Sequence, residues 1–262
     1  MSYKKIMTVE AFIKILKSIE KNYKTVYVYG GIGQIVTNSL LNTKAKQYPS
    51  FYTLNRMAIL KKFIGKGYYG FDCVNLLKSV LWGWNGDKSK VYCGAKYASN
   101  TVPDVSADGF IQLCTDVSRN FKNIKIGEAV WMSGHIGVYI GNGLVIECSP
   151  RWKNSVQITC CANVKTVAGY NKRTWTKHGK IPWLIYGSSQ VANYFSACSK
   201  SETSLVDALQ KAGFDSSIAF RKKIAIANNI KNYTGTYSQN SQLLGKMKNG
   251  ELVKPWFIKN QK

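Results

Sequence analysis

The chain has 262 residues, enough for two domains, and its 45% hydrophobic content excludes an intrinsically disordered protein. Its formal net charge of +24 indicates an anionic partner, such as a nucleic acid, an anionic membrane surface or a polyanionic cell wall. Because zinc-finger spacings and aromatic RNA-binding motifs are absent and the lysines are spread along the chain, we expect a generic polyanion and no nucleic acid.

The first predicted element is an amphipathic helix over residues 8–23. Charged residues interrupt this segment, which has no long apolar core and no small-residue cleavage site, so we do not expect a secretory signal. No stretch is apolar enough to predict a membrane span. Residues 25–29 then predict a short extended segment, and residues 53–65 predict another helix. The apolar face of the first helix is formed by Val9, Phe12, Ile13, Leu16 and Ile19.

Cys73 stands at the start of a predicted helix, in the stretch FDCVNLLKSVLWGW. Asp72 is a favourable N-cap residue, so Cys73 falls in the first turn, where unpaired N–H groups and the helix dipole favour negative charge. A thiolate at this position is a candidate nucleophile with a lowered pKa. A buried structural cysteine is the alternative, and the local pattern supports both. The apolar face comprises Cys73, Leu76, Leu77, Val80, Leu81 and Trp84.

The cysteine pattern limits the kinds of site that the chain can build. There are seven cysteines, an odd number, and no C-x-x-C pair. The pattern therefore predicts neither a zinc site nor a full disulfide framework, and most thiols are expected to be reduced and buried. They are Cys73, Cys93, Cys114, Cys148, Cys160, Cys161 and Cys198.

A thiolate nucleophile needs a base, and the chain has two histidines. His135 opens the stretch HIGVYIGNGLVIEC, which alternates as a strand does, passes a turn signal and resumes as a second strand. His178 lies in WTKHGKIPW, a basic and turn-rich stretch, and is expected to be a surface or loop residue. His135 is therefore the candidate base.

The loop of this hairpin decides where Glu147 lies. A three-residue loop over 141–143 places Glu147 on the sheet face of His135, one diagonal step away, so that it can orient the ring. A two-residue loop turns Glu147 to the opposite face, and a solvated strand glutamate is the alternative role. The pairs expected with the three-residue loop are Gly137 with Glu147 and Ile140 with Leu144.

The order of elements predicts two domains. A third strand, SVQITCC at 155–161, follows the hairpin, and helices followed by antiparallel strands predict an α+β domain over residues 1–187. A small, polar stretch predicts a linker over 188–203. Residues 204–262 predict a small all-α domain of three short helices: one from Leu205 that ends near Gly213, one in DSSIAFRKKIAIANNI capped by Asp215 or Ser216, and one in TYSQNSQLLGKMKNG.

Four motifs follow one another in order: YVYGG at 27–31, FDC at 71–73, IGEAVWM at 126–132 and GHIGVYIGNG at 134–143. Together they resemble the NlpC-type family of papain-like cysteine peptidases, which cut peptidoglycan stem peptides. The resemblance covers roughly residues 10–186 and implies a nucleophile on a helix packed against the sheet that carries the base. Within residues 204–262, the stretches FDSSIAFRKKIA and NYTGTYSQNSQLL resemble the C-terminal wall-binding modules of phage lysins and bacterial wall hydrolases, with a stabilising or dimerising appendage as the alternative.

The resemblance also implies roles for individual residues. The catalytic residues that it implies are Cys73 as nucleophile, His135 as base and Glu147 as the polar residue that orients the base. The substrate-binding residues expected are Tyr29, which lines the site, Asp72, which often binds a stem-peptide amine in this family, and Trp131 of the third motif. No metal or organic cofactor is expected.

The chain departs from the family pattern in three places. Val74 stands after the cysteine, where a small residue is usual. A long segment, 32–66, separates the first two motifs, which the family keeps close together. Glu147 stands where the family has His, Asn or Gln, which leaves its role and the fine specificity open.

These features predict a peptidoglycan hydrolase of a phage or prophage with a Gram-positive host. We expect it to cleave a stem-peptide isopeptide bond, between D-glutamate and the diamino acid. A CHAP-like amidase or cross-bridge endopeptidase is the alternative enzyme, because that family often uses Glu as its third residue. A non-catalytic wall- or polyanion-binding protein is the alternative outside enzymes.

The expected partners are cell-wall peptidoglycan and, as further candidates, anionic wall polymers. We expect synthesis in the host cytoplasm and arrival at the wall by holin-dependent release or within a virion. The sequence leaves the oligomeric state open.

Overall fold

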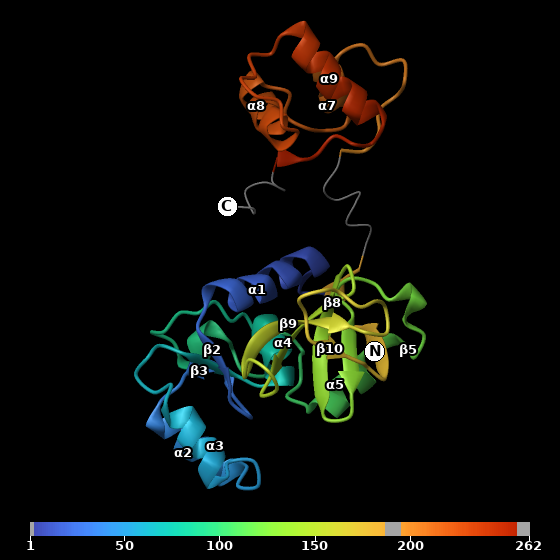
Figure 1. Cartoon of the computed structure of the whole chain (residues 1–262). Helices are drawn as coiled ribbons and strands as arrows, with labels where there is room; N and C mark the ends of the chain where they lie inside the picture. Colours follow the sequence, from blue (N-terminus) through green and yellow to red (C-terminus); the bar gives the residue numbers. More distant parts are fainter. Residues whose placement is uncertain (1–2, 187–194, 256–262) are drawn as a thin grey trace. The chain divides into compact units, whose positions relative to one another are not determined.

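The structure is a computed structural model that describes residues 3–186 and 195–255 (Figure 1). The chain divides into two compact units, Met1–Tyr186 and Gly187–Lys262, each with its own hydrophobic core. The first unit mixes helices with strands that form three sheets. It contains every residue that the sequence singles out for chemistry.

The largest sheet of the first unit has seven strands in the order β10-β9-β8-β7-β6-β11-β5. Its neighbouring strands pair antiparallel except β10 and β9, which run parallel. The third strand that SVQITCC predicts is present as β9. The strands are β5 (Thr115–Ser118), β6 (Ala129–Met132), β7 (His135–Gly141), β8 (Leu144–Ser149), β9 (Ser155–Cys161), β10 (Lys172–Arg173) and β11 (Lys177–Lys180). A further pair joins β1 (Met7–Thr8) to β12 (Leu184–Ile185).

Helix α1 (Val9–Asn22) is the helix that the sequence predicts over residues 8–23. The Thr8 hydroxyl caps it by accepting a hydrogen bond from the Ala11 N–H, at 3.2 Å. All five apolar residues of the predicted face are buried in the main core. The amphipathic pattern therefore identified both the helix and its inner face.

Helix α4 (Cys73–Leu81) begins where the sequence predicts, directly after Asp72. The Asp72 carboxylate accepts from the Asn75 N–H at 2.6 Å, which is the expected N-cap hydrogen bond. The helix is nevertheless buried on every side, including Asn75, Lys78 and Ser79. This occurs because α4 packs against α1, β3, β7 and β8 and against the short helix α5 (Ala107–Leu113).

The long segment 32–66 folds into a strand and two helices and adds a small core of its own. Strand β4 (Tyr69–Phe71) lies between β2 (Thr25–Tyr27) and β3 (Ile32–Ile35). Figure 1 shows α2 (Asn38–Gln47) and α3 (Leu54–Lys61) side by side at one end of the unit. The sequence predicted α3, but α2 and β3 had no predicted counterpart.

The hairpin of β7 and β8 pairs Gly137 with Glu147, as the three-residue loop predicts. The loop itself is different: Gly141 pairs with Leu144, so only two residues turn the chain. These are Asn142 and Gly143, both with positive φ, as a tight hairpin turn requires. The register shifts between Tyr139 and Gly141, and this bulge restores the pairing that a two-residue loop would otherwise displace.

The described residues of the second unit contain three α-helices around an apolar core. They are α7 (Leu205–Lys211), α8 (Ile218–Ala227) and α9 (Tyr237–Lys248). The N-cap of α8 is Ser217, not Asp215 or Ser216, because the Asp215 carboxylate instead accepts from the Ser217 N–H. The predicted linker, 188–203, lies partly outside the described residues. Its second part is folded, since Phe195 is buried in the core of this unit.

All seven cysteines are free, and six of them are buried, as predicted. Among the described residues, no helix has both the length and the apolar character needed to cross a bilayer. Within the same residues, no group of three or more His, Cys, Asp or Glu side chains is arranged to hold a metal ion.

Candidate active site

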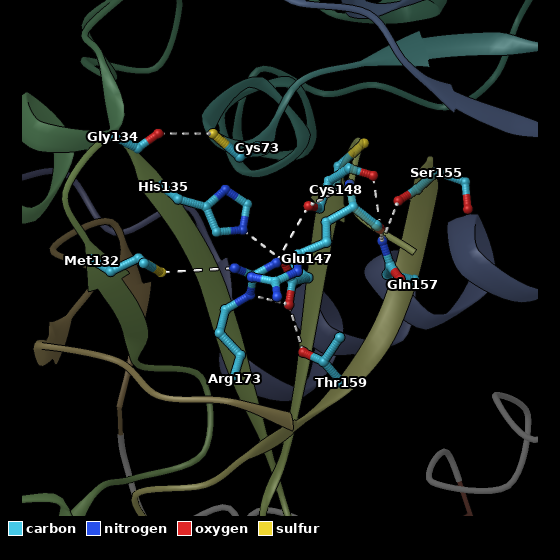
Figure 2. Close-up of polar contacts among 12 residues, drawn as sticks. Cys73, Met132, Gly134, His135, Glu147, Cys148, Ser155, Gln157, Thr159 and Arg173 are labelled. Atoms are coloured by element: carbon cyan, nitrogen blue, oxygen red, sulfur yellow. Dashed lines mark hydrogen bonds and ion pairs between the residues drawn. The ribbon is translucent and has the colours of Figure 1, made fainter. Parts of the chain in front are cut away.

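The Cys73 thiol lies at the N-terminal end of α4 and faces the start of β7 (Figure 2). Its sulfur is 4.0 Å from the carbonyl oxygen of Gly134, the residue before His135. The side chain is only 4% exposed. The capped helix end thus carries the thiol to the strand that begins with the candidate base, although 62 positions separate the two residues in the sequence.

Burial raises the pKa of the Cys73 thiol to about 12, and the Asp72 carboxylate beside it acts in the same direction. The backbone N–H groups of Ile136, Val74 and Cys73 lower the pKa but do not offset these effects. The expectation that the helix N-terminus lowers this pKa was therefore wrong in its net sign. The reason is that a helix end stabilises a thiolate by less than burial costs it.

The His135 ring lies between Cys73 and Glu147 (Figure 2). Its Nε2 atom is 2.6 Å from Glu147 Oε2. Figure 2 shows the other ring nitrogen, Nδ1, on the side of Cys73. Trp175 stacks on the ring, with centroids 5.5 Å apart and planes 13° apart. The ring is thus held by a carboxylate at one nitrogen and by an aromatic face, and it presents its second nitrogen toward the thiol.

Glu147 is fully buried, and both of its oxygens are bonded. Oε2 meets His135, and Oε1 accepts from Thr159 Oγ1 at 2.6 Å and from Arg173 Nε at 2.9 Å. Burial opposes ionisation of this carboxyl. Hydrogen bonds and positive charge from His135 and Arg173 outweigh burial and hold its pKa below the ordinary value. The predicted contact between Glu147 and His135 is therefore present in the structure.

The sequence analysis assigned no role to Arg173 or Thr159. Arg173 lies in β10, a strand of two residues that carries no periodic signal. Its guanidinium lies over the rings of Trp152 and Trp175, at 4.7 and 5.5 Å from their centroids. The one clue in the sequence was Glu147 itself, since a buried glutamate needs a cation or several donors.

Asp108, on α5, fixes the turn before His135. One of its oxygens accepts from the Gly134 N–H and from the Trp131 indole N–H, both at 2.8 Å. Trp131 is on β6 and pairs across the sheet with Ile136 of β7. The Lys177 ammonium lies 4.5 Å from the centroid of the Trp131 ring. Trp131 is therefore a neighbour of the site whose indole nitrogen is already bonded within the protein.

Asp72 is turned into the protein. Besides capping α4, its carboxylate accepts from the Gly30 N–H at 2.9 Å and from the Asn75 amide at 2.8 Å. It is 5% exposed, and burial raises its pKa. Its observed contacts tie the YVYGG motif to the helix of Cys73. The binding of a substrate amine by Asp72, which the family resemblance implied, stays a prediction.

Tyr29 lies at the surface beside Asp72 and Cys73. Burial raises the pKa of Tyr29, and the charges of Asp72 and Cys73 raise it further, which places the three groups near one another. Its ring stacks on Phe51 at 4.8 Å and meets the edge of Tyr48 at 4.9 Å. Both partners come from the segment 32–66, so this segment extends the predicted lining of the site.

His178 is not a surface or loop residue. It lies in β11, between β6 and β5, and is 4% exposed. Its Nδ1 atom pairs with the Glu128 carboxylate, and its Nε2 atom is 3.0 Å from the Asn120 carbonyl oxygen. The turn-rich composition around His178 concealed a central strand, because cross-strand pairing outweighed local propensity.

No family model matches the chain. Over 47 residues it is 51% identical to an L-alanyl-D-glutamate peptidase of Listeria phage A118, a match that covers 18% of this chain and 17% of that protein. Among solved structures, it is similar to the peptidoglycan hydrolase RipB of Mycobacterium tuberculosis, with 17% identity and a TM-score of 0.34. That similarity covers 68% of this chain and 66% of RipB. Neither match spans two thirds of the similar protein.

Proposed function

We propose that the chain is a peptidoglycan hydrolase with an NlpC-type, papain-like catalytic unit in which Cys73 is the nucleophile, His135 the general base and Glu147 the residue that orients the base. The observation that carries this proposal is the continuous arrangement of a helix-end thiol, an imidazole facing it and a buried carboxylate bonded to the far ring nitrogen. These three groups and their order match what cysteine acyl transfer requires.

In this mechanism His135 takes the Cys73 proton as the sulfur attacks the scissile carbonyl carbon. A thiol pKa of about 12 disfavours a preformed thiolate at neutral pH. Proton transfer to His135 therefore accompanies the attack of the sulfur. Backbone N–H groups at the start of α4 stabilise the oxyanion. His135 then returns the proton to the leaving amine, and a thioester remains on Cys73. Water hydrolyses the thioester, which releases a carboxylate and restores the thiol.

Two further observations support the cell wall as the substrate. The formal charge of +24 favours a polyanionic surface. The phage protein that matches over 47 residues is named as a peptidase of the L-alanyl–D-glutamate bond. For this chain we propose cleavage of the neighbouring isopeptide bond, between D-glutamate and the diamino acid, by a phage or prophage lysin that reaches the wall from the host cytoplasm or from a virion.

The presence of glutamate as the orienting residue favours a second candidate, a CHAP-like N-acetylmuramoyl-L-alanine amidase or cross-bridge endopeptidase. Digestion of purified cell walls separates the candidates through the mass of the products and the new amino termini. A free α-amino group on the diamino acid supports the isopeptidase. A free L-alanine amino terminus supports the amidase, and freed cross-bridge termini support the endopeptidase. Walls that bind the protein and release no fragment would reject catalysis.

We propose that the second unit binds the wall. It has its own core, and basic residues outnumber acidic ones in 195–255, as tethering to an anionic polymer requires. A chain ending at Tyr186 should then sediment less with walls, by about tenfold or more, and keep its rate on a soluble stem peptide. Equal sedimentation of the truncated and full-length chains would assign wall binding to the basic catalytic unit instead.

A further inference from the structure

Arg173 makes its closest carboxylate contact with the oxygen of Glu147 that faces away from His135. Its Nε donates to Glu147 Oε1 at 2.9 Å, while Oε2 meets the His135 ring at 2.6 Å. Figure 2 shows the guanidinium and the imidazole at the same carboxylate, where each meets a different oxygen. The rest of the guanidinium is also held, by Ser149 Oγ at 3.3 Å and Met132 Sδ at 3.7 Å. Arg173 therefore has a fixed place behind the residue that orients the base.

The burial of Glu147 explains why such a partner is needed. A carboxylate with no exposed surface becomes protonated unless nearby charges and donors stabilise its charged form. A protonated Glu147 carries no negative charge to favour the imidazolium that forms during proton transfer. Thr159 supplies a hydrogen bond to Oε1 but no charge. An arginine side chain such as Arg173 supplies the permanent positive charge that a hydroxyl cannot.

The titratable or charged groups that face Glu147 are His135 from β7 and Arg173 from β10. Cys148, next along β8, and Cys73, across the ring from α4, are thiols whose pKa values are raised by burial. His135 exchanges a proton in the proposed mechanism, so Arg173 is the contact of Glu147 whose charge stays constant through the reaction.

We propose that Arg173 is a positioning residue of this active site, which keeps Glu147 aimed at His135 and ionised at lower pH than its burial alone would allow. This inference rests on the proposed function. It also accounts for glutamate in a place where the resembling family has a neutral or weakly basic side chain. The glutamate and the arginine form one unit, and each needs the other inside the protein.

The test compares pH profiles of kcat and kcat/KM on a soluble stem peptide. Arg173→Met should lower kcat about tenfold to a hundredfold at mildly acidic pH with little change in KM, because Glu147 loses its charge there. It should also move the acidic limb of the profile upward by about one to three pH units, since removing a cation raises the pKa of a buried carboxyl. Arg173→Lys keeps a charge and should move this limb less.

Two matched variants separate charge from packing. Thr159→Val removes the other hydrogen bond to the same oxygen without removing charge, and should leave the acidic limb within about half a pH unit. In a Glu147→Gln background, Arg173→Met should produce no further shift of the limb, because the two residues act through one path. Thermal unfolding of each variant verifies that folded proteins are compared.

An unchanged acidic limb in folded Arg173→Met would overturn the proposal. A change confined to KM would also overturn it, because it would make Arg173 a substrate ligand. A limb shift of equal size with and without Glu147 would assign the effect to general packing.

A second measurement needs no activity and so stands apart from the proposed function. In inactive Cys73→Ala protein, the carbon-13 signal of the Glu147 carboxyl, assigned by its loss in Glu147→Gln, reports its titration. Arg173→Met should move that titration to higher pH. An unmoved titration would refute the role of Arg173, whereas hydrolysis by Cys73→Ala would refute only the proposed function.

Discussion

The large sheet contains two histidine–glutamate pairs that differ in what the second ring nitrogen of the histidine faces. His135 pairs with Glu147, and His178 pairs with Glu128. Both nitrogens of His178 are engaged within the protein, by Glu128 and by the Asn120 carbonyl. His135 is bonded to glutamate through Nε2 and presents Nδ1 on the side of the Cys73 thiol. A histidine–glutamate pair is therefore not a catalytic signature, because what the second ring nitrogen faces decides its use.

A cysteine lies near each pair, and both cysteines belong to the main apolar core. Cys73 approaches the strand end that carries His135. Cys114 lies near Glu128, whose charge adds to burial in raising the pKa of this thiol. In β11, residue 179 faces the side of the sheet opposite to that of its neighbour His178. A Cβ atom built at Gly179 would lie 3.0 Å from the Cβ atom of Cys114, so Cys114 lies on that opposite side. The Cys114 thiol instead donates to the Phe110 carbonyl at 3.5 Å.

The largest expected difference between the pairs is in activity. His135→Ala should lower hydrolysis of cell walls by about a hundredfold or more, since the general base is lost. His178→Gln should keep the activity of each folded molecule but lower the free energy of unfolding by about 2–4 kcal/mol, because Glu128 then lacks a buried partner. Turbidity assays and thermal unfolding on the same preparations measure both effects. Similar activity losses in the two folded variants would break the comparison.

The two glutamates should differ in the same way, with a smaller effect. Glu147→Gln should lower kcat about tenfold or more, whereas Glu128→Gln should alter stability and spare the activity of folded protein. The pH dependence of stability sharpens this contrast. The pKa of Glu147 lies below its ordinary value of 4.5, so its contribution to stability is present above that pH and is lost as pH falls through the folded-state pKa.

Between about pH 5 and about pH 3, wild type should therefore lose more unfolding free energy than Glu147→Gln. Denaturant titrations at several pH values measure the difference. Parallel stability curves for the two proteins would show that the structure overstates how strongly Glu147 is held as an anion.

Alkylation of Cys73 tests the state of the resting site and has the smallest expected effect. With a thiol pKa of about 12, the rate of iodoacetamide modification at Cys73 should rise about tenfold per pH unit through neutral and mildly alkaline pH. Peptide mass spectrometry gives the rate for Cys73 and for Cys114 within one sample. A plateau near neutral pH at Cys73 would instead indicate a preformed thiolate–imidazolium pair.

Local rules predicted much of the first unit. The Asp72 cap placed Cys73 in the first turn of α4, and strand alternation placed His135 and Gly137 on one sheet face. Both features depend on neighbouring residues, which sequence patterns describe well. The predicted pairing of Ile140 with Leu144 was wrong, because Gly141 pairs with Leu144 across a two-residue turn. A bulge beside Ile140 then restores the predicted register farther along the hairpin. The two errors in loop length and register offset each other, so the predicted face of Glu147 was still right.

What the sequence could not predict depends on contacts between distant segments. Arg173 reaches Glu147 from a two-residue strand, and its role appears only once β10 is aligned beside β9. The net pKa of Cys73 depends on burial by the whole unit, which the helix-end argument omitted. His178 looked exposed by composition, yet pairing with β6 and β5 buries it.

The central claim is that the thiol of Cys73 attacks the substrate, and one substitution tests it most directly. Cys73→Ala removes the nucleophile and little volume, so the variant should fold, sediment with walls as wild type does, and release no new amino termini. Mass analysis of wall digests, with circular dichroism and sedimentation of the same protein, gives the answer. Fragment release by folded Cys73→Ala at a rate near that of wild type would contradict the mechanism.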